Sequence, residues 1–334
     1  MPKIAVIGGG VVGMSTAVNV IESIPGARVT VYAERLTPDT TSDGAAGIFR
    51  ADCPPGVPAE RAKEWLALSF QHYGSIAYSA EAAKAGISPL SGYDIYTSEQ
   101  PSSMLSLEVI FQYRSVTKEE LAKLPMNFRS GYFMSTVYVE CQLYLPWLMK
   151  RFASHGGRIL KQRVENLDQF VGEYDVVVNC AGGGNKTLLP DPAVYGMRGQ
   201  LIRVRAPWVK QFCYANKGDL GYIIPNTSNV VLGGTRQRDN YNLVPNEDDK
   251  KMIWEKCCKL QPSLRSSEWL YDWVGVRPFR EPLRLETETR NVGGKVQKVV
   301  HNYGHGSDGV AMSWGTAVKA TELVRQTLDP SSKL

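Results

Sequence analysis

The chain has 334 residues, of which 43% are apolar and 21% charged, and its formal net charge is +5. This composition is typical of a globular protein and excludes an intrinsically disordered chain. At about 150 residues per domain, the length predicts two domains or one large one. The basic residues are scattered and form no tract, so we expect no nucleic-acid partner.

The most apolar segment, residues 4–14, is interrupted by four glycines, and no run of 18 apolar residues occurs. We therefore expect no membrane-spanning helix and no membrane partner. The segment also lacks the basic start and the cleavage site of a secretory signal. The six cysteines show no metal-ligand spacing, which predicts free thiols in a reducing compartment and no metal site. They are Cys53, Cys141, Cys180, Cys213, Cys257 and Cys258.

The first 33 residues predict a β-α-β unit. Residues 3–13 are typical of a buried strand that runs into a glycine turn, and residues 11–23 have helical spacing that stops at Pro25-Gly26. Residues 28–33 then alternate as a second strand, which ends at Glu34-Arg35. Such a unit favours a parallel sheet.

The rest of the chain predicts a mixed architecture. A second strand and glycine turn occurs at residues 174–184. Further strands are expected at 199–206, 221–225 and 229–233, and helices at 60–83, 248–260 and 309–327. We expect an α/β fold in which a nucleotide-binding domain with a parallel sheet is interrupted twice by a domain with a mixed or antiparallel sheet. The first domain would take residues 1–55, 145–190 and 275–334, and the second residues 56–144 and 191–274.

Three glycines between the first strand and the first helix predict a dinucleotide site. Gly8 allows a tight turn, Gly10 lets a pyrophosphate approach the backbone, and Gly13 permits close packing of helix on strand. Glu34 ends the second strand, where its carboxylate can accept hydrogen bonds from ribose hydroxyls and would repel a 2′-phosphate. NADP is therefore disfavoured, and this unit alone leaves both FAD and NAD open.

Several short motifs follow one another along the chain, and together they are more specific than any of them alone. They are Thr-Pro-Asp-Thr-Thr-Ser-Asp at 37–43 with Ala-Ala-Gly at 45–47, Val-Val-Asn-Cys at 177–180, Arg-Gly-Gln at 198–200, Gly-Gly-Thr-Arg-Gln at 233–237, Val-Arg-Pro at 276–278 and His-Asn-Tyr-Gly-His-Gly at 301–306. In these motifs the chain resembles the FAD-dependent D-amino-acid oxidase family, and within it the members that act on D-aspartate. The resemblance covers residues 4–324.

The resemblance implies that FAD is the cofactor and that the nucleotide-binding domain is a Rossmann-like FAD-binding domain. Glu34 and Arg35 would lie at the adenosine ribose, and Val164 would contact the adenine end through its backbone. The remaining positions implied in FAD binding are Thr41 and Ser42 at the pyrophosphate, Gly47 and Ile48 beside the flavin, and Gly306, Asp308, Gly309 and Val310 along the isoalloxazine ring. Backbone N–H groups and the start of the last helix would stabilise negative charge on the reduced ring. We expect the Asp308 carboxylate to point to solvent.

The resemblance also implies a substrate site. Arg277 would bind the α-carboxylate of a D-amino acid through its planar fork, Tyr222 would share that carboxylate, and Ser307 would lie at the substrate. Arg236 would pair with a second, side-chain carboxylate, so that D-aspartate and D-glutamate are preferred. No residue would act as acid or base, because the substrate's α-hydrogen passes to the flavin as hydride. Dioxygen would reoxidise the flavin, and the products would be a 2-oxo acid, ammonia and hydrogen peroxide.

Other functions remain open at this point. If Arg236 turns to solvent, the enzyme would be a broad oxidase that accepts neutral D-amino acids such as D-alanine. A flavin amine oxidase of the sarcosine or glycine oxidase kind, and a flavin-binding protein without turnover, are further alternatives. A lid is expected at residues 213–220, where Tyr214 would cap the site or Lys217 would supply a mobile charge.

The last three residues, Ser332, Lys333 and Leu334, match the Ser-Lys-Leu address for import into peroxisomes. A peroxide-producing oxidase would lie beside catalase in that compartment. We therefore expect a location in the peroxisome matrix and the peroxisomal import receptor as a partner.

Overall fold

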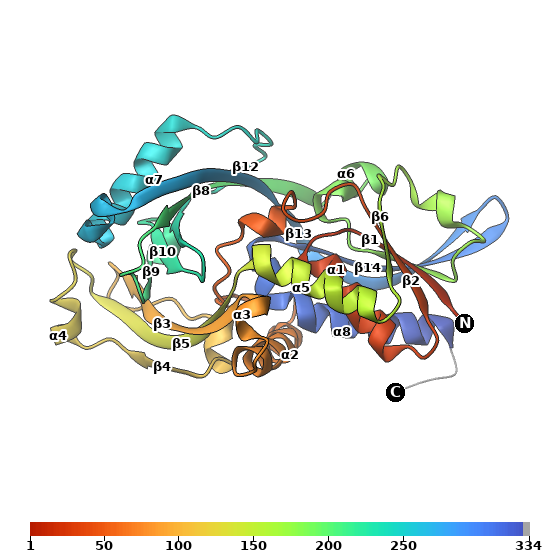
Figure 1. The fold of residues 1–334 in the computed structure, drawn as a ribbon, viewed down its shortest axis with the longest axis horizontal. Helices are drawn as coiled ribbons and strands as arrows, with labels where there is room; N and C mark the ends of the chain where they lie inside the picture. The colour runs from red at the N-terminus through yellow and green to blue at the C-terminus, as the bar shows by residue number, and fades with distance from the viewer. Residues whose placement is uncertain (330–334) are drawn as a thin grey trace.

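The computed structural model describes residues 1–329, and the strands of this part form one continuous sheet (Figure 1). The sheet has 14 strands, in the order β4-β5-β3-β9-β10-β11-β8-β13-β14-β7-β1-β2-β6, with β12 paired to β8 beside this path. The address Ser332-Lys333-Leu334 lies outside the described residues.

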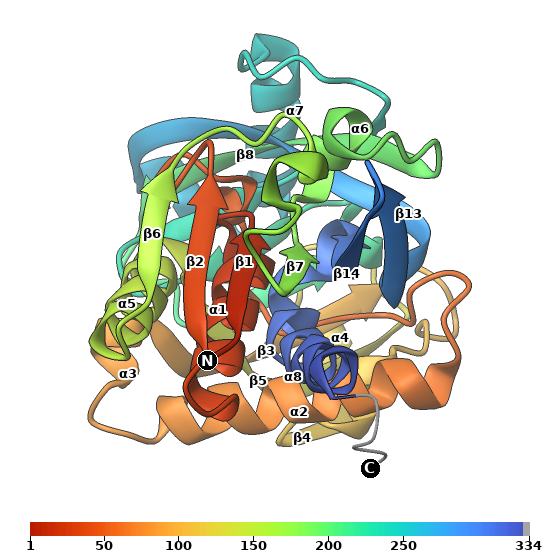
Figure 2. The ribbon, with the colours of Figure 1, turned by 90° about the vertical axis from the view of Figure 1, so that its right-hand side faces the viewer.

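One end of the sheet is parallel, and Figure 2 shows its strands side by side. They are β6 (Arg158–Lys161), β2 (Arg28–Ala33), β1 (Lys3–Ile7), β7 (Val176–Asn179) and β14 (Lys295–His305). The strands β1 and β7 are almost fully buried and consist largely of valine, isoleucine and alanine, as expected where helices and loops cover both faces of a parallel sheet.

The other end of the sheet is mainly antiparallel. Its strands are β13 (Glu268–Val292), β8 (Val194–Arg205), β11 (Val230–Gly233), β10 (Tyr222–Pro225), β9 (Phe212–Ala215), β3 (Ile87–Tyr96), β5 (Ser130–Val139), β4 (Gln112–Ser115) and the short β12 (Gln237–Arg238). Only β3 and β9 pair in parallel here. The long strands β8 and β13 pair with each other and run between the two ends of the molecule (Figure 1). This mixture of a parallel and an antiparallel part confirms the predicted fold class.

Helices pack mainly against the parallel part and against each other. The long ones are α1 (Val11–Ser23), α2 (Ala59–Ala77), α5 (Cys141–Ser154) and α8 (Gly309–Leu328), and α7 (Glu247–Leu260) covers β8 and β11. The short helices are α3 (Ala82–Ala85), α4 (Lys118–Leu121) and α6 (Asn185–Leu188). Helix α1 packs against α8 and α5 with small and branched apolar residues, which bury it almost completely.

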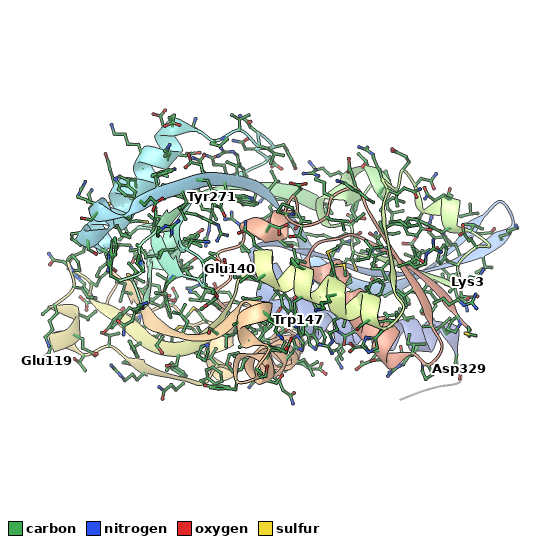
Figure 3. All side chains as sticks on the ribbon, viewed as in Figure 1. Lys3, Glu119, Glu140, Trp147, Tyr271 and Asp329 are labelled. Atoms are coloured by element: carbon green, nitrogen blue, oxygen red, sulfur yellow. The ribbon has the colours of Figure 1, made fainter. Side chains whose placement is uncertain are left out.

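The start of α5 is tied to the antiparallel part by Glu140, which lies near the middle of the molecule in Figure 3. Its carboxylate is buried and accepts hydrogen bonds from the backbone N–H groups of Thr227 at 3.0 Å and Ser228 at 3.3 Å, in the turn between β10 and β11. A charged acceptor with several donors is stable in the interior. This contact fixes the start of α5 against the antiparallel part of the sheet.

The helices and strands that were expected from the sequence occur with small changes of their ends. Helix 11–23 and strand 28–33 are as predicted, whereas the helical segment expected at 60–83 ends at Ala77. The five parallel strands come from the three ranges assigned to the FAD-binding domain. Strand β13 runs through the boundary placed between 274 and 275, and the division into domains stays a prediction.

None of the helices within residues 1–329 is long and apolar enough to cross a membrane. In the same part of the chain, no three histidine, cysteine or acidic side chains are grouped as metal ligands. All six cysteines are free thiols, and three of them (Cys141, Cys180 and Cys257) are buried so deeply that their pKa is raised far above the usual value.

Candidate active site

A single cavity of about 1260 Å³ collects the residues that the sequence predicted. It exceeds the roughly 300–1,000 Å³ of ordinary small-molecule pockets, so an extended cofactor and a substrate can share it. The predicted residues that line it are Gly8, Gly10, Gly13, Glu34, Arg35, Thr41, Ser42, Gly47, Ile48, Val164, Tyr222, Arg236, Arg277, Gly306, Ser307, Asp308, Gly309 and Val310. Segments up to 302 positions apart therefore meet at one site.

The glycine turn between β1 and α1 forms one part of the wall. Gly8 has a φ of +127°, which only glycine adopts readily, and a Cβ atom placed on Gly13 would lie 2.1 Å from the Gly8 carbonyl oxygen. Gly10 caps α1 without a side-chain hydrogen bond. Apart from Val11 N–H, which donates to Ser42 Oγ at 3.0 Å, the first N–H groups of α1 are free to bind an anion such as a pyrophosphate.

A short 3-10 turn, Thr41–Gly44, lies next to the start of α1. Its shape is held by Asp43, which accepts hydrogen bonds from the Thr40 backbone at 2.9 Å and the Thr40 hydroxyl at 2.6 Å. The buried Arg203 of β8 donates to the Asp43 and Ala45 carbonyl oxygens at 3.3 and 3.1 Å. Ser42 is thus held from behind, and its hydroxyl faces the anion site.

Glu34 and Arg35 follow the end of β2, which three strands of the sheet (β14, β7 and β1) separate from β13 and Arg277. Glu34 Oε1 lies 3.4 Å from Nη1 of Arg163, and both side chains are about half exposed. An ion pair this exposed contributes about 0–1 kcal/mol, so it leaves the Glu34 carboxylate available for ribose hydroxyls. Arg163 was not predicted, because a lone arginine beside a predicted backbone contact at Val164 gives no sequence signal.

Another part of the cavity wall is formed by a 3-10 turn, Gly306–Asp308, which leads directly into α8. The helix is not capped by a side chain, so its first N–H groups and its positive dipole end face the cavity. Gly47 and Ile48 line the same cavity. Backbone donors beside a helix start suit the carbonyl edge of a flavin ring on which negative charge develops.

The expectation that Asp308 points to solvent is wrong. Asp308 is partly buried in the cavity wall, and burial raises the pKa of its carboxyl to about 7, helped by the Asp52 carboxylate. The cations of Arg50, Arg236 and Arg277 act in the opposite direction. Asp308 lies near these charged groups because it directly precedes α8, whose first residues line the cavity.

Arg277 projects from β13, and its Nη1 donates to the Thr235 carbonyl oxygen at 3.3 Å. Tyr222 of β10 lies within the field of this guanidinium and of Arg236; both lower the pKa of its hydroxyl, while burial raises it more. Tyr222 is therefore a neutral hydroxyl that can donate a hydrogen bond to an anion. In the described residues Arg277 has no carboxylate partner.

Arg236 is exposed to the cavity, and its Nη2 donates to Tyr214 Oη at 3.2 Å. The Tyr214 ring is stacked on Tyr222, with 5.3 Å between centroids and 6° between planes. Of the two residues considered for the lid, Tyr214 thus lies inside the site. Lys217 does not line this cavity, and its Nζ lies 3.8 Å from Asp52 Oδ2.

Arg50 and Asp94 were not predicted as site residues; they lie far apart in the chain and form a buried ion pair at 2.6 Å. Arg50 lines the cavity beside Tyr214. Charged residues of this kind are common on surfaces, so only the tertiary contact distinguishes them.

Two buried histidines have structural environments. His305 is hydrogen-bonded to Thr316 Oγ1 at 3.0 Å, and burial lowers its pKa to about 3. His301 Nε2 lies 2.9 Å from Glu288, and burial lowers its pKa to about 4. Both rings are neutral at physiological pH, and each has at least one ring nitrogen in a hydrogen bond.

Comparison with known proteins decides the family. A family model described as FAD dependent oxidoreductase matches residues 3–323. The chain belongs to this family. Its cofactor is FAD, and the glycine turn, the free start of α1 and the uncapped start of α8 fit that cofactor along the length of the cavity.

Among curated relatives, the chain is 42% identical to human D-aspartate oxidase, with 97% of this chain and 95% of the relative covered. It is 35% identical to D-aspartate oxidase 1 of Caenorhabditis elegans (100% and 99% covered) and 35% identical to a D-amino acid oxidase of Dugesia ryukyuensis (97% and 98%). Among solved structures, glycine oxidase of Geobacillus kaustophilus has a TM-score of 0.78 over 98% of this chain and 95% of that one, at 17% identity, which shows a shared fold.

Proposed function

We propose that this flavoenzyme oxidises acidic D-amino acids, D-aspartate and D-glutamate, to the 2-oxo acid, ammonia and hydrogen peroxide. The observation that carries the proposal is the pair Arg236 and Arg277. Both line one cavity, and neither forms an ion pair with a carboxylate of the described residues. Two unpaired guanidinium groups suit a substrate with two carboxylates.

Arg277 and Tyr222 are assigned to the α-carboxylate. The guanidinium can form two parallel charge-assisted hydrogen bonds, and the Tyr222 hydroxyl adds a third donor. This set fixes the rotation of the substrate about its Cα. The Cα–H bond can then be held toward the end of the cavity where α8 begins, and such positioning supplies most of the catalytic effect.

Arg236 is assigned to the side-chain carboxylate. A bound substrate with a neutral side chain would cover the Arg236 guanidinium and leave it desolvated without a partner, which costs about 2–5 kcal/mol. Preference for dicarboxylates follows from this penalty. The 42% identity to human D-aspartate oxidase supports the same specificity.

Bound FAD supplies the redox chemistry, because it accepts a hydride and its reduced form reacts with dioxygen. The chain contributes binding and orientation, and the first N–H groups of α8 stabilise negative charge at the flavin end of the cavity. No side chain is assigned as acid or base; the two buried histidines are neutral and already hydrogen-bonded.

A second candidate is a broad oxidase of neutral D-amino acids. It is favoured by the 35% identity to a D-amino acid oxidase of Dugesia ryukyuensis, and by the exposure of Arg236, whose guanidinium hydrogen-bonds only to the Tyr214 hydroxyl within residues 1–329. In this case the substrate would not contact Arg236, and the enzyme would oxidise D-alanine at a rate similar to that for D-aspartate.

Anaerobic bleaching of the bound flavin separates these candidates. We expect rapid loss of the oxidised-flavin absorbance with D-aspartate, little with D-alanine and none with L-aspartate. Equal rates with D-alanine would favour the broad oxidase. A flavoprotein that none of the three bleaches would contradict both.

The variant Arg236→Leu tests the residue assignment. We expect kcat/KM for D-aspartate to fall at least roughly tenfold, which corresponds to about 1.4 kcal/mol, while the value for D-alanine stays the same or rises. Lys217→Leu is a matched control that removes one cation outside the cavity lining. An equal fall for both substrates in Arg236→Leu would show that the assignment is wrong.

We also propose import into the peroxisome matrix through Ser332-Lys333-Leu334. A receptor-read signal requires a free carboxyl end, and a peroxide-forming reaction belongs near catalase. A fluorescent protein fused to the N-terminus should colocalise with catalase, and deletion of the three residues should make it diffuse. Unchanged localisation after the deletion would contradict the proposal.

A further inference from the structure

A buried ion pair stands behind the substrate end of the cavity. Arg50 Nε donates to Asp94 Oδ2 at 2.6 Å, and the exposed fractions of the two side chains are 6% and 0%. Arg50 Nη2 also donates to Tyr96 Oη at 3.3 Å. Asp94 and Tyr96 lie on β3, in the middle of the antiparallel part, so the guanidinium is anchored to the sheet. Charges buried this deeply hold their geometry, because breaking the pair would leave an uncompensated ion.

The guanidinium of Arg50 lies over the ring of Tyr214, with 4.3 Å between Cζ and the ring centroid. Tyr214 is itself 8% exposed and stacked on Tyr222, nearly parallel. A desolvated cation–π contact is worth up to about 2 kcal/mol, and aromatic stacking adds to it. The ring of Tyr214 is thus held by two contacts, one with Arg50 and one with Tyr222.

Tyr214 contacts Arg236 through its hydroxyl group. Arg236 Nη2 donates to Tyr214 Oη at 3.2 Å, and no other side chain in the described residues hydrogen-bonds to this guanidinium. An exposed arginine loses considerable rotamer entropy when it binds a ligand, and a fixed partner reduces that loss. The orientation of Arg236 therefore depends on the placement of one hydroxyl group.

We propose that Arg50 and Asp94 are positioning residues that determine specificity: they fix Tyr214, and Tyr214 fixes Arg236 for the side-chain carboxylate of the substrate. This inference rests on the proposed function, since it assumes that Arg236 binds that carboxylate. Arg50 also lines the cavity, but its Nε and Nη2 donate to Asp94 and Tyr96, so we assign it to positioning and not to a substrate carboxylate.

The experiment uses the holoenzyme and three variants. Tyr214→Phe keeps the stacked ring and removes only the hydroxyl that contacts Arg236. The double variant Arg50→Met with Asp94→Leu replaces the ion pair by apolar groups of similar size, so that no unpaired charge is buried. Arg114→Met is the matched control: Arg114 pairs with Glu120 at 2.7 Å and lies 5.0 Å from the Phe133 ring centroid, but it does not line the cavity.

Two readouts distinguish positioning from a general structural effect. The first is kcat/KM for D-aspartate and for D-alanine. The second is the Kd of malonate compared with the Kd of propionate, both followed by the change in flavin absorbance. Malonate has two carboxylates and propionate has one, and neither has an amino group, so neither is oxidised. We expect Tyr214→Phe and the double variant to raise KM for D-aspartate and Kd for malonate at least roughly fivefold, with D-alanine and propionate changed less than twofold.

Equal losses for dicarboxylate and monocarboxylate ligands, or losses in Arg114→Met as large as in Tyr214→Phe, would overturn the inference. Tyr214→Phe keeps the inference testable if the double variant does not fold, since it removes a single oxygen. Arg236→Leu tests the assignment of Arg236 separately from the positioning role of Arg50 and Asp94. If it leaves the preference for D-aspartate unchanged, the assignment of Arg236 fails and this inference with it, whereas the proposed function fails only if D-aspartate does not bleach the flavin faster than D-alanine. If Arg236→Leu abolishes the preference while Tyr214→Phe does not, only the positioning role fails.

Discussion

The guanidinium of Arg277 packs directly against the backbone of Gly199. A Cβ atom placed on Gly199 would lie 2.4 Å from both terminal nitrogens of Arg277. Gly199 pairs with Gly275 across β8 and β13, two positions before Arg277, so the sheet register brings them together. This contact explains the glycine of the Arg-Gly-Gln motif at 198–200, because Arg277 occupies the space that a side chain on residue 199 would need.

Gly199→Ala should displace the Arg277 guanidinium without removing its charge. Because Arg277 is assigned to the carboxylate that every amino acid carries, KM should rise roughly tenfold or more for D-aspartate and D-alanine alike. This differs from Arg236→Leu, which affects only the acidic substrate. Steady-state peroxide formation with both substrates measures the effect, and an unchanged KM for D-alanine would contradict the assignment of Arg277.

Gly13→Ala should prevent tight FAD binding, because the new Cβ would lie 2.1 Å from the Gly8 carbonyl oxygen and force β1 and α1 apart. The flavin-to-protein absorbance ratio after purification should fall well below that of the unchanged protein. Gly74→Ala in α2 is the control for the same chemical change, since its Cβ would meet only Phe111 at 3.8 Å. It should keep its flavin and gain up to about 1 kcal/mol of stability.

The affinity for acidic substrates should depend on pH through Asp308. Its carboxyl pKa is raised to about 7, mainly by burial and then by Asp52, so it is largely neutral at pH 6 and ionised at pH 8.5. The ionised form adds an anion within the field of Arg236 and Arg277 and competes with the substrate carboxylates. The KM for D-aspartate relative to D-alanine should therefore rise between pH 6 and 8.5, and the D-alanine value corrects for titration of the substrate amine.

Asp308→Asn keeps the shape of the side chain and removes its titration. The ratio of the two KM values should then be nearly constant over the same pH range. A ratio that rises equally in the variant and the unchanged protein would assign the pH dependence to another group.

Arg203→Met should loosen the turn that presents Ser42. Arg203 is 1% exposed and donates to the Asp43 and Ala45 carbonyls and to Asn229 Oδ1, the last at 2.8 Å. Its loss leaves buried acceptors without donors, at about 1–3 kcal/mol each. We expect a lower Tm and weaker FAD binding together, measured by thermal unfolding and flavin titration. A lower Tm with unchanged FAD affinity would limit Arg203 to a structural role.

Local patterns predicted the first β-α-β unit well. Alternation, helical spacing and the positions of Gly8, Gly10 and Gly13 depend on neighbouring residues, so a short window of sequence contains the needed information. The same holds for the start of α8 after residue 308. The motifs that carry the family resemblance predicted the cavity-lining positions at Arg236 and Arg277 for a different reason, because they report shared ancestry and not local geometry.

Contacts between distant segments were not predictable in this way. Arg50, Asp94 and Tyr214 come from three separate parts of the chain, and each alone is an ordinary arginine, aspartate or tyrosine. The burial of Asp308 could not be predicted either, because the charged residues around it, such as Asp52 and Arg236, come from other parts of the chain.

The α/β class and the FAD-dependent family could be predicted from the amino-acid sequence, and the start of α1 could be named as a candidate anion site. Which charges are buried, which are paired and which face the cavity became visible only in the folded chain. The physical reason is that strand and helix formation depend on local backbone preference and on periodic burial. The state of a charge depends on all groups within several ångströms, wherever they lie in the chain.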